Sequence, residues 1–222
     1  MACFALAHMS CAGAWAWGEV PERLRAAGHE VVAPDLSLHA GVTPSDHADD
    51  LAAALGEDRP DGSVVVAGHS YGGLVAPPAA ERLGLAAAAG VVVDGFVIDG
   101  DESASDVRPS RVQPRREEAA TRGDGMWTAG DPPAMAPEWW SRLKPMPISA
   151  FEAPVPLTGA AARLPSWFVW CRKSDFADQA ARARERGWTV VEVDAAHVLP
   201  LVDPGACAEA LLDAARSVRP SP

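Results

Sequence analysis

Short apolar runs alternate with amphipathic stretches along the chain. Runs typical of strands cover 3–8, 30–35, 63–69, 90–97, 166–171 and 188–194. Stretches typical of helices cover 14–27, 45–56, 71–83, 175–186 and 204–217. The strand runs are short, continuous and rich in valine, as expected for strands buried on both faces. This alternation predicts an α/β fold, in which a mostly parallel six-stranded sheet carries helices on both faces.

One long segment interrupts the alternation. From Asp99 to Pro165 the chain is rich in Pro, Gly and charge, shows no strand pattern, and looks helical only at 115–122 and 137–143. A long insertion in a compact α/β domain is usually either functional or disordered. The three tryptophans Trp127, Trp139 and Trp140 favour a packed lid over a disordered loop. We therefore predict one domain over 1–222, with a lid inserted at approximately 99–160.

The stretch "VVVAGHSYGGL" ends the third strand run with a serine between glycines. A sharp turn from a buried strand into a helix would expose the oxygen of Ser70 at the sheet edge. Bulky side chains two residues away would collide there, and Gly68 and Gly72 remove those collisions. The sequence thus predicts a nucleophile elbow, since a strand precedes the motif and a helix follows it.

A serine nucleophile needs a base, and a carboxylate that orients the base. His197 alone among the six histidines follows the serine at a distance and comes after the last strand run. The acid should follow the fifth strand, where the preferred candidate is Asp175, four residues past the strand end. Asp178 and Asp94 are the alternatives, Asp178 as part of the next helix and Asp94 at the end of the fourth strand.

The oxyanion hole of such a site consists of two backbone N–H groups. One should come from Tyr71, directly after the nucleophile. The other should come from Ser10 or Cys11, in the loop after the first strand. We take Ser10 and Tyr71 as the predicted pair.

Composition narrows the classes of partner. The formal net charge of −11 argues against nucleic acid and anionic membranes. No apolar run reaches the roughly 18–20 residues of a membrane span, and the apolar start lacks the basic residues of a signal peptide. Cys3, Cys11, Cys171 and Cys207 are widely spaced, which predicts buried free thiols rather than a metal site. The expectation is a cytoplasmic protein with a small-molecule substrate, no metal and no organic cofactor; a homodimer is left open.

Several segments together resemble the α/β-hydrolase superfamily, and within it the compact branch of plant methyl esterases, hydroxynitrile lyases and bacterial relatives. They are "FALAHMSCAGAWAW", "VAGHSYGGLVA", "VVVDGFVIDGDES", "RLKPMPISAFEAPV" and "ERGWTVVEVDAAHVLPLVDPGACAEALLDAA". The resemblance implies the α/β-hydrolase fold, with Ser70 as nucleophile, His197 as base and the acid within 174–178. In ungapped register with some relatives, Ser174 stands in the acid's place.

Two departures from the branch concern its chemistry. Its esterases have Gly where this chain has Met9; its lyases have Thr there and a Lys in place of Val198. The missing Lys argues against cyanohydrin cleavage, and Met9 should narrow the pocket beside the oxyanion hole. We expect a serine hydrolase that cleaves a small apolar or aromatic ester, with substrate contacts from Met9, Cys11, Trp127, Trp140 and Val198.

Two other functions are compatible with the same residues. The scaffold could support a non-hydrolytic lyase or biosynthetic tailoring enzyme that uses His197 as a general base. It could also be a catalytically silent protein that binds a ligand in the same pocket.

Overall fold

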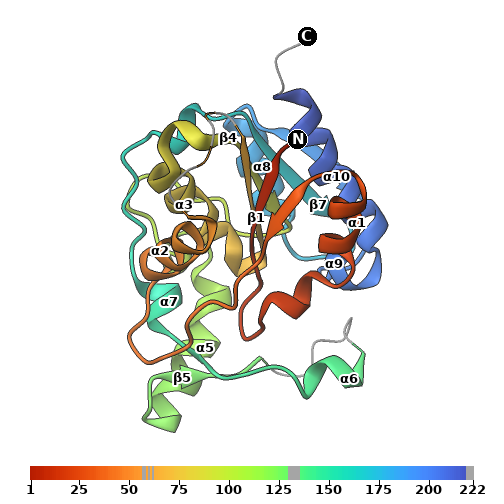
Figure 1. The fold of residues 1–222 in the computed structure, drawn as a ribbon. Coiled ribbons are helices and arrows are strands. Elements are labelled where there is room, and N and C mark those ends of the chain that lie inside the picture. Colours follow the sequence, from red (N-terminus) through yellow and green to blue (C-terminus); the bar gives the residue numbers. More distant parts are fainter. Residues whose placement is uncertain (57–58, 60, 62, 130–135, 219–222) are drawn as a thin grey trace.

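A single parallel sheet of six strands organises the molecule (Figure 1). The structure is a computed structural model, and it describes residues 1–56, 59, 61, 63–129 and 136–218. The strand order is β2-β1-β3-β4-β7-β8, and every neighbouring pair is parallel. The strands are β1 (Cys3–Ala7), β2 (Glu30–Val32), β3 (Val64–His69), β4 (Ala87–Val93), β7 (Ser166–Cys171) and β8 (Thr189–Val193). The predicted six-stranded parallel sheet is confirmed.

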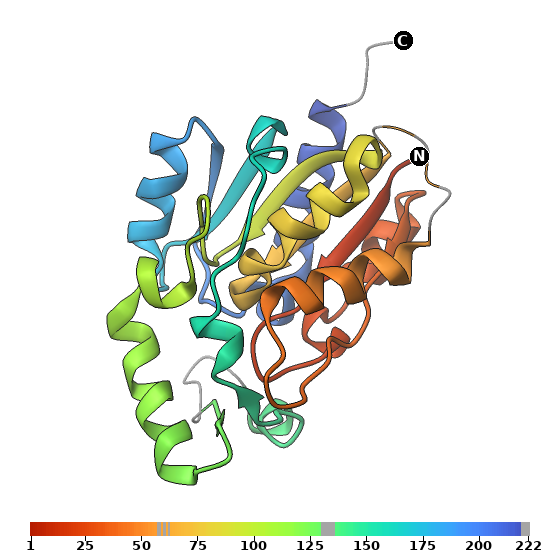
Figure 2. The same cartoon turned by 90° about the vertical axis from the view of Figure 1, so that its left-hand side faces the viewer.

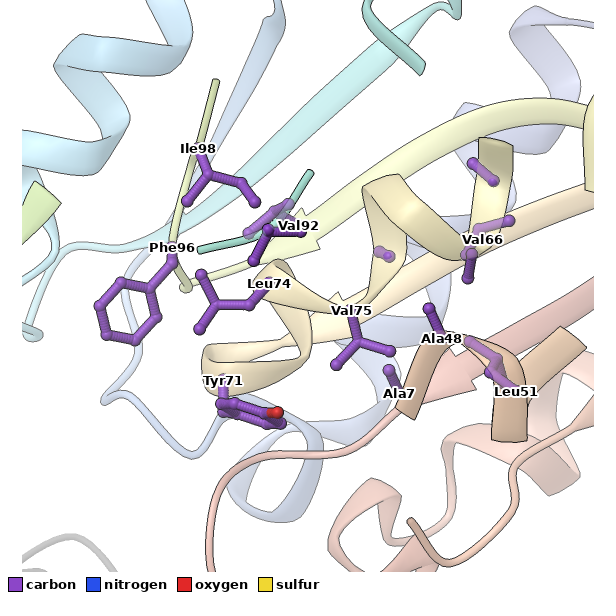
Figure 3. Close-up of a cluster of buried hydrophobic side chains, with 14 of the residues drawn as sticks. Ala7, Ala48, Leu51, Val66, Tyr71, Leu74, Val75, Val92, Phe96 and Ile98 are labelled. Atoms are coloured by element: carbon purple, nitrogen blue, oxygen red, sulfur yellow. The ribbon is translucent and has the colours of Figure 1, made fainter. Parts of the chain in front are cut away.

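Helices cover both faces of this sheet, as predicted. One face packs against α1 (Val20–Ala26) and α10 (Pro204–Ser217), and the other against α2 (Pro44–Leu55), α3 (Ala76–Leu83) and α8 (Ala177–Glu185). Successive residues of a strand point to opposite faces of the sheet. Phe4 of β1 therefore packs in the core beneath α1 and α10, whereas Ala5 packs in the core beneath α2, α3 and α8. Figure 3 shows the second core, where Val66 lies near Leu51 of α2. Burial on both faces explains the continuous apolar strands.

Two predicted helices are divided in the structure. The first becomes a 3-10 turn, η1 (Ala14–Trp17), and then α1, because Gly18 between them adopts a φ of +52°. The stretch 71–83 becomes a 3-10 turn, η2 (Ser70–Leu74), followed by α3 and by η3 (Gly84–Ala86). Pro77 and Pro78 therefore fall in the first turn of α3, where a missing N–H leaves no helical hydrogen bond unmade.

The segment between β4 and β7 lies largely beyond the carboxyl ends of the strands (Figures 1 and 2). It contains α4 (Ala104–Val107), α5 (Pro109–Arg122), β5 (Met126–Trp127), α6 (Pro137–Trp140), β6 (Met146–Pro147), α7 (Ser149–Glu152) and η4 (Ala161–Arg163). The antiparallel pair β5–β6 corrects the prediction of no strands here, because two-residue strands are too short to show alternation. Residues 130–135 of the predicted lid lie outside the described residues.

The four cysteines are free and buried, which confirms that prediction. No helix in the described part of the chain is long and apolar enough to cross a membrane. The last short helix, α9 (Leu199–Val202), follows β8 and leads into α10. It places the loop that carries His197 over the carboxyl ends of the strands.

Candidate active site

Ser70 stands at the junction of β3 and η2 in a backbone conformation that few residues other than glycine adopt. Its φ is +56°, and its side chain is nearly buried. A Cβ at Gly68 would lie 2.0 Å from the carbonyl oxygen of Gly72, and a Cβ at Gly72 would lie 2.3 Å from that of Ala7. Both glycines are therefore required by close backbone contacts, as the motif predicts. The strain at Ser70 is local and is held by the packing around the turn.

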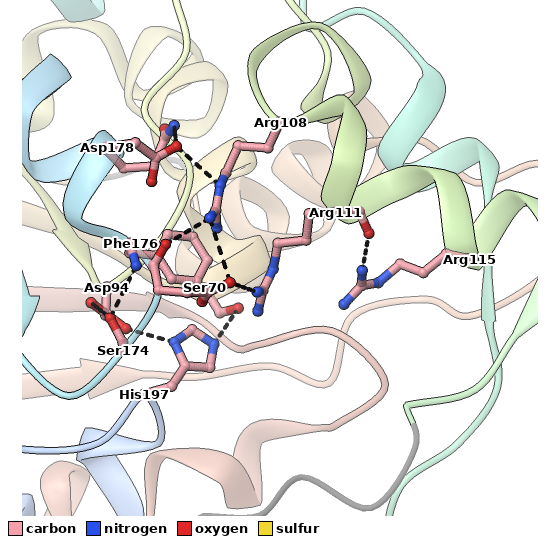
Figure 4. Close-up of polar contacts among 11 residues, drawn as sticks. Ser70, Asp94, Arg108, Arg111, Arg115, Ser174, Phe176, Asp178 and His197 are labelled. Atoms are coloured by element: carbon pink, nitrogen blue, oxygen red, sulfur yellow. Dashed lines mark hydrogen bonds and ion pairs between the residues drawn. The ribbon is translucent and has the colours of Figure 1, made fainter.

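His197 bridges the serine and a buried carboxylate (Figure 4). Its Nε2 lies 2.9 Å from Oγ of Ser70, and its Nδ1 lies 2.7 Å from Oδ2 of Asp94. A carboxylate can only accept, so this contact places the imidazole proton on Nδ1 and leaves Nε2 to accept from the serine hydroxyl. The structure thus brings together two residues that are 127 positions apart in the sequence.

Asp94 directly follows β4, the strand beside β3, and is fully buried. Its φ is +43°, so the chain turns sharply where the strand ends. Besides His197, its carboxylate accepts from the backbone N–H of Cys171 at 3.0 Å and from Oγ of Ser174 at 2.8 Å. These donors satisfy the buried carboxylate, which would otherwise be costly to bury. Ser174, which stands in the acid's place in the family resemblance, here hydrogen-bonds to the acid.

The preference for Asp175 as the partner of His197 is therefore corrected to Asp94. The Asp175 carboxylate forms an ion pair with Arg111, and its backbone carbonyl accepts from Nη2 of Arg108 at 2.6 Å. Asp178 pairs with Nε of Arg108 at 3.1 Å. Both aspartates are thus bound to α5. The sequence signal for the acid was the pattern "VVVDG", in which a polar residue and a glycine end a buried strand, as at the serine.

Two aromatic neighbours hold the imidazole of His197. The ring of Phe176 stacks on it, with the centroids 4.9 Å apart and the planes at 4°. Nε2 of His69 donates to the carbonyl oxygen of His197 at 2.8 Å, which fixes the backbone of the loop. Burial and, next, the nearby His197 lower the pKa of His69 to about 3, so this ring stays neutral near pH 7. The sequence analysis did not identify either neighbour.

The two predicted oxyanion residues lie beside Ser70 on well-supported backbone. The hydroxyl of Tyr71 donates to Nδ1 of His47 at 2.6 Å, and Nε2 of His47 donates to the carbonyl oxygen of Ser37 at 2.6 Å. The hydroxyl of Tyr71 is thereby tied through His47 to the backbone of Ser37. Ser10 lines the cavity next to Ser70.

The loop on the Ser10 side is fixed in a similar way by a buried histidine. Nδ1 of His8 donates to the carbonyl oxygen of Met9 at 2.8 Å, and Nε2 accepts from the backbone N–H of Leu36 at 3.1 Å. Burial lowers the pKa of His8 to about 4. Cys11, two residues after Met9, has a φ of +59°, which turns the chain away from the sheet.

A cavity of about 640 Å³ opens onto Ser70 and His197. Of the predicted substrate contacts, Met9, Trp127 and Val198 line it. Cys11 and Trp140 do not: Cys11 is buried in the core beneath, and Trp140 packs against the cluster of Met9, Ala12, Ala16 and Val198. Asp175, predicted as the acid, also lines the cavity, and the wall further includes residues not predicted to lie there, namely Phe96, Arg111, Arg115, Glu118, Phe151 and Lys173.

A second cavity, of about 380 Å³, lies elsewhere, between α3 and residues 157–166. None of Ser70, Asp94 and His197 lines it. Among the described residues, no group of three or more His, Cys, Asp or Glu side chains is arranged to hold a metal ion.

Curated proteins with similar sequences are esterases by name. A segment of 80 residues is 39% identical to polyneuridine aldehyde esterase of Rauvolfia serpentina, covering 32% of this chain and 30% of that protein. A segment of 125 residues is 30% identical to the carbendazim hydrolyzing esterase of a Nocardioides species, covering 51% of this chain and 50% of that protein. These matches span about a third to a half of the length of the relatives.

Solved structures share the fold over almost the full chain. An extracellular alpha/beta-hydrolase from a Paenibacillus species, described as sharing structural and functional homology with tobacco Salicylic Acid Binding Protein 2, superposes with a TM-score of 0.83 at 19% identity. The superposition covers 96% of this chain and 99% of the Paenibacillus chain. A pyrethroid hydrolase from Sphingobium faniae superposes with a TM-score of 0.71 at 19% identity, covering 97% of this chain and 98% of the hydrolase. The profile of the Alpha/beta hydrolase family matches residues 6–210. The chain therefore belongs to the alpha/beta hydrolase family.

Proposed function

We propose that this protein is a serine hydrolase that cleaves a small carboxylic ester through Ser70, His197 and Asp94. The observation that carries the proposal is the continuous chain of hydrogen bonds from Asp94 through the imidazole to Oγ of Ser70. The esterase names of the relatives support the same reaction class. The cavity beside Ser70 has an apolar part formed by Met9, Phe96 and Val198, and its volume of about 640 Å³ is large enough for a small apolar or aromatic ester.

The geometry supports a two-step reaction. Oγ of Ser70 attacks the ester carbonyl while Nε2 of His197 takes the hydroxyl proton, and the buried Asp94 stabilises the resulting imidazolium. The backbone N–H groups of Tyr71 and Ser10 would donate to the tetrahedral oxyanion. His197 then gives the proton to the leaving alcohol. Water, activated by the same imidazole, hydrolyses the acyl group on Ser70 and restores the enzyme.

The direct test is covalent labelling of Ser70. A fluorophosphonate probe should label the wild-type protein, and mass spectrometry of the digest should find the label on the peptide that contains Ser70. The Ser70→Ala variant should neither be labelled nor hydrolyse 4-nitrophenyl acetate, while its circular dichroism spectrum matches that of the wild type. A wild-type protein that is folded but unlabelled would favour the silent ligand-binding alternative.

Isotope labelling separates hydrolysis from the non-hydrolytic alternative. Hydrolysis of an ester in water enriched in oxygen-18 should place one labelled oxygen in the product acid. A product without label would indicate elimination or rearrangement, in which His197 acts as a general base alone.

We also propose that the protein works in a reducing compartment such as the cytoplasm. All four thiols are unpaired and buried, which is the usual state of cysteines where disulfides do not form.

A further inference from the structure

Three cationic side chains line the cavity that opens onto Ser70, and two of them are neutralised. They are Arg111 and Arg115 of α5, and Lys173 from the loop after β7. The guanidinium of Arg111 forms an ion pair with Asp175. Nζ of Lys173 lies 3.0 Å from Oδ2 of Asp194. Arg115 has no ion-pair partner among the described residues.

The guanidinium of Arg115 retains most of its capacity to donate. Its one hydrogen bond to a described residue runs from Nη1 to the carbonyl oxygen of Arg111, and its Nε is buried without a partner among the described residues. A guanidinium has five N–H donors, so several are left for a ligand. Figure 4 shows Arg111 and Arg115 extending from α5 on the side where Ser70 and His197 lie.

Aromatic rings fix the position of Arg115 in the wall. Its guanidinium carbon lies 4.6 Å from the ring centroid of Trp127 and 5.6 Å from that of Phe151. Burial and, next, the charge of Arg111 lower the pKa of Arg115 to about 10, so the group is still cationic near pH 7. A cation that is held in place before binding loses little side-chain entropy when an anion arrives.

The nearby carboxylates are engaged elsewhere. Glu118, on the same helix and lining the same cavity, accepts from the backbone N–H of Thr128 at 2.9 Å and from its hydroxyl at 2.7 Å. Asp175 is bound by Arg111 and Arg108. The planar fork of an arginine matches a carboxylate, which accepts two parallel hydrogen bonds.

We propose that the preferred ester carries a free carboxylate, which Arg115 binds while Ser70 attacks the ester group. This inference rests on the proposed esterase function and names its substrate class: esters that also bear a carboxylic acid, such as monoesters of dicarboxylic acids. The apolar part of the cavity, formed by Met9, Phe96 and Val198, would contact the chain between the two groups.

The test uses matched pairs of substrates. Monomethyl esters of the dicarboxylic acids from succinic to suberic are each compared with the same ester in which a primary amide replaces the free acid. The kcat/KM of each is measured from released methanol. At the best chain length, the acid should exceed its amide by about tenfold or more, as expected for hydrogen bonds to a charged group.

Two variants on α5 assign the preference to one side chain. Arg115→Gln should bring the ratio of acid to amide close to one. Arg122→Gln removes the same charge from the exposed end of the same helix, where Arg122 pairs with Asp124, and should leave the ratio unchanged. If Arg115→Gln does not fold, Arg115→Lys keeps the charge without the planar fork and should lower the ratio of acid to amide. The substrate pairs measured on the wild type decide by themselves whether the carboxylate is preferred.

The outcomes separate this inference from the function on which it rests. Equal hydrolysis of acid and amide at every length, with 4-nitrophenyl acetate still cleaved and Ser70 still labelled, would overturn the carboxylate preference alone. A preference that persists in Arg115→Gln would overturn the assignment to Arg115. Absence of both labelling and ester cleavage would overturn the esterase function, and the inference with it.

Discussion

The buried carboxylate of Asp94 determines which nitrogen of the His197 imidazole carries the proton. It accepts from His197, from the Cys171 backbone and from the Ser174 hydroxyl. These three donors engage both of its carboxylate oxygens, and it directly follows the last residue of β4. Because it accepts at Nδ1, the imidazole can take a proton only at Nε2, which faces Ser70. The orientation of the imidazole is therefore set by a residue that does not line the cavity beside Ser70.

Replacing Asp94 with asparagine tests this assignment. Asp94→Asn keeps the shape but offers an amide in place of the charge, so kcat for 4-nitrophenyl acetate should fall roughly 10³–10⁴-fold. Asp175→Asn, which removes a carboxylate from the same cavity without touching His197, should lose less than about tenfold. Steady-state kinetics on both variants, with circular dichroism as the folding control, decides between the two aspartates. The reverse order of the two losses would restore Asp175.

Some residues of the site could be predicted from the sequence, and the acid could not, for a physical reason. Ser70 is marked by two glycines that backbone contacts require, and His197 by its place after the last strand. The acid depends on which of several loops reaches Nδ1, and arginines 60 or more positions away decide that by binding Asp175 and Asp178. Such long-range pairing leaves no local signal. Asp94, in the pattern "VVVDG", was an alternative ranked below Asp175, and the arginines at 111 and 115, one helical turn apart, were not predicted to lie at the site.

At the scale of elements, the serine turn and the turn after β4 are packed backbone against backbone. A Cβ at Gly73 would lie 2.5 Å from the carbonyl oxygen of Phe96, and a Cβ at Gly95 would lie 2.4 Å from that of Ser70. The N–H of Phe96 also donates to the carbonyl oxygen of Ser70 at 3.3 Å. The two turns that hold Ser70 and Asp94 therefore pack as one unit, joined by close backbone contacts and a hydrogen bond.

Alanine substitution at the serine turn should disrupt this unit. Gly68→Ala places a methyl group against backbone atoms that cannot move independently, so we expect a strongly lowered Tm and loss of activity. Gly90→Ala is the matched control, because Gly90 lies in β4 and its Cβ would meet only Oγ of Ser166 at 3.5 Å. Thermal unfolding of both variants measures the difference. A Gly68→Ala variant with the wild-type Tm would contradict the packing argument.

The segment between β4 and β7 illustrates how far element prediction reaches. Its Trp, Pro and Gly content indicated a packed insertion, but only part of α5 was recognised, because Pro109 and Pro114 lie within it. Pro109 begins the helix, where proline is favoured, and Pro114 sits inside it against the usual preference. The pair β5–β6 is fixed by packing of Trp127 and Met146 into the core, not by local pattern.

At the scale of the whole molecule, buried neutral histidines link stability to pH. Burial lowers the pKa of His8 to about 4 and that of His69 to about 3, whereas in the unfolded chain both titrate near 6.5. Below pH 6.5 the unfolded state therefore binds more protons than the folded state. The free energy of unfolding must fall as the pH drops from about 6.5 toward about 4.

A urea-unfolding series across this pH range measures the effect. The midpoint should decline from pH 7 to pH 4, and His69→Gln, which can still donate to the carbonyl of His197, should make the decline shallower. His39→Gln changes an exposed histidine and should leave the decline as it is in the wild type. A His69→Gln slope equal to that of the wild type would show that His69 does not contribute.

The ring of Phe176 connects His197 to the start of α5. One face of its ring lies on the imidazole of His197, and the guanidinium groups of Arg108 and Arg111 lie 4.4 and 4.8 Å from its centroid. His197 and the two arginines at the start of α5 thus pack on the same aromatic ring. Because one ring contacts both groups, a substitution that removes the Phe176 ring would change the packing of the His197 imidazole and of both guanidinium groups at once.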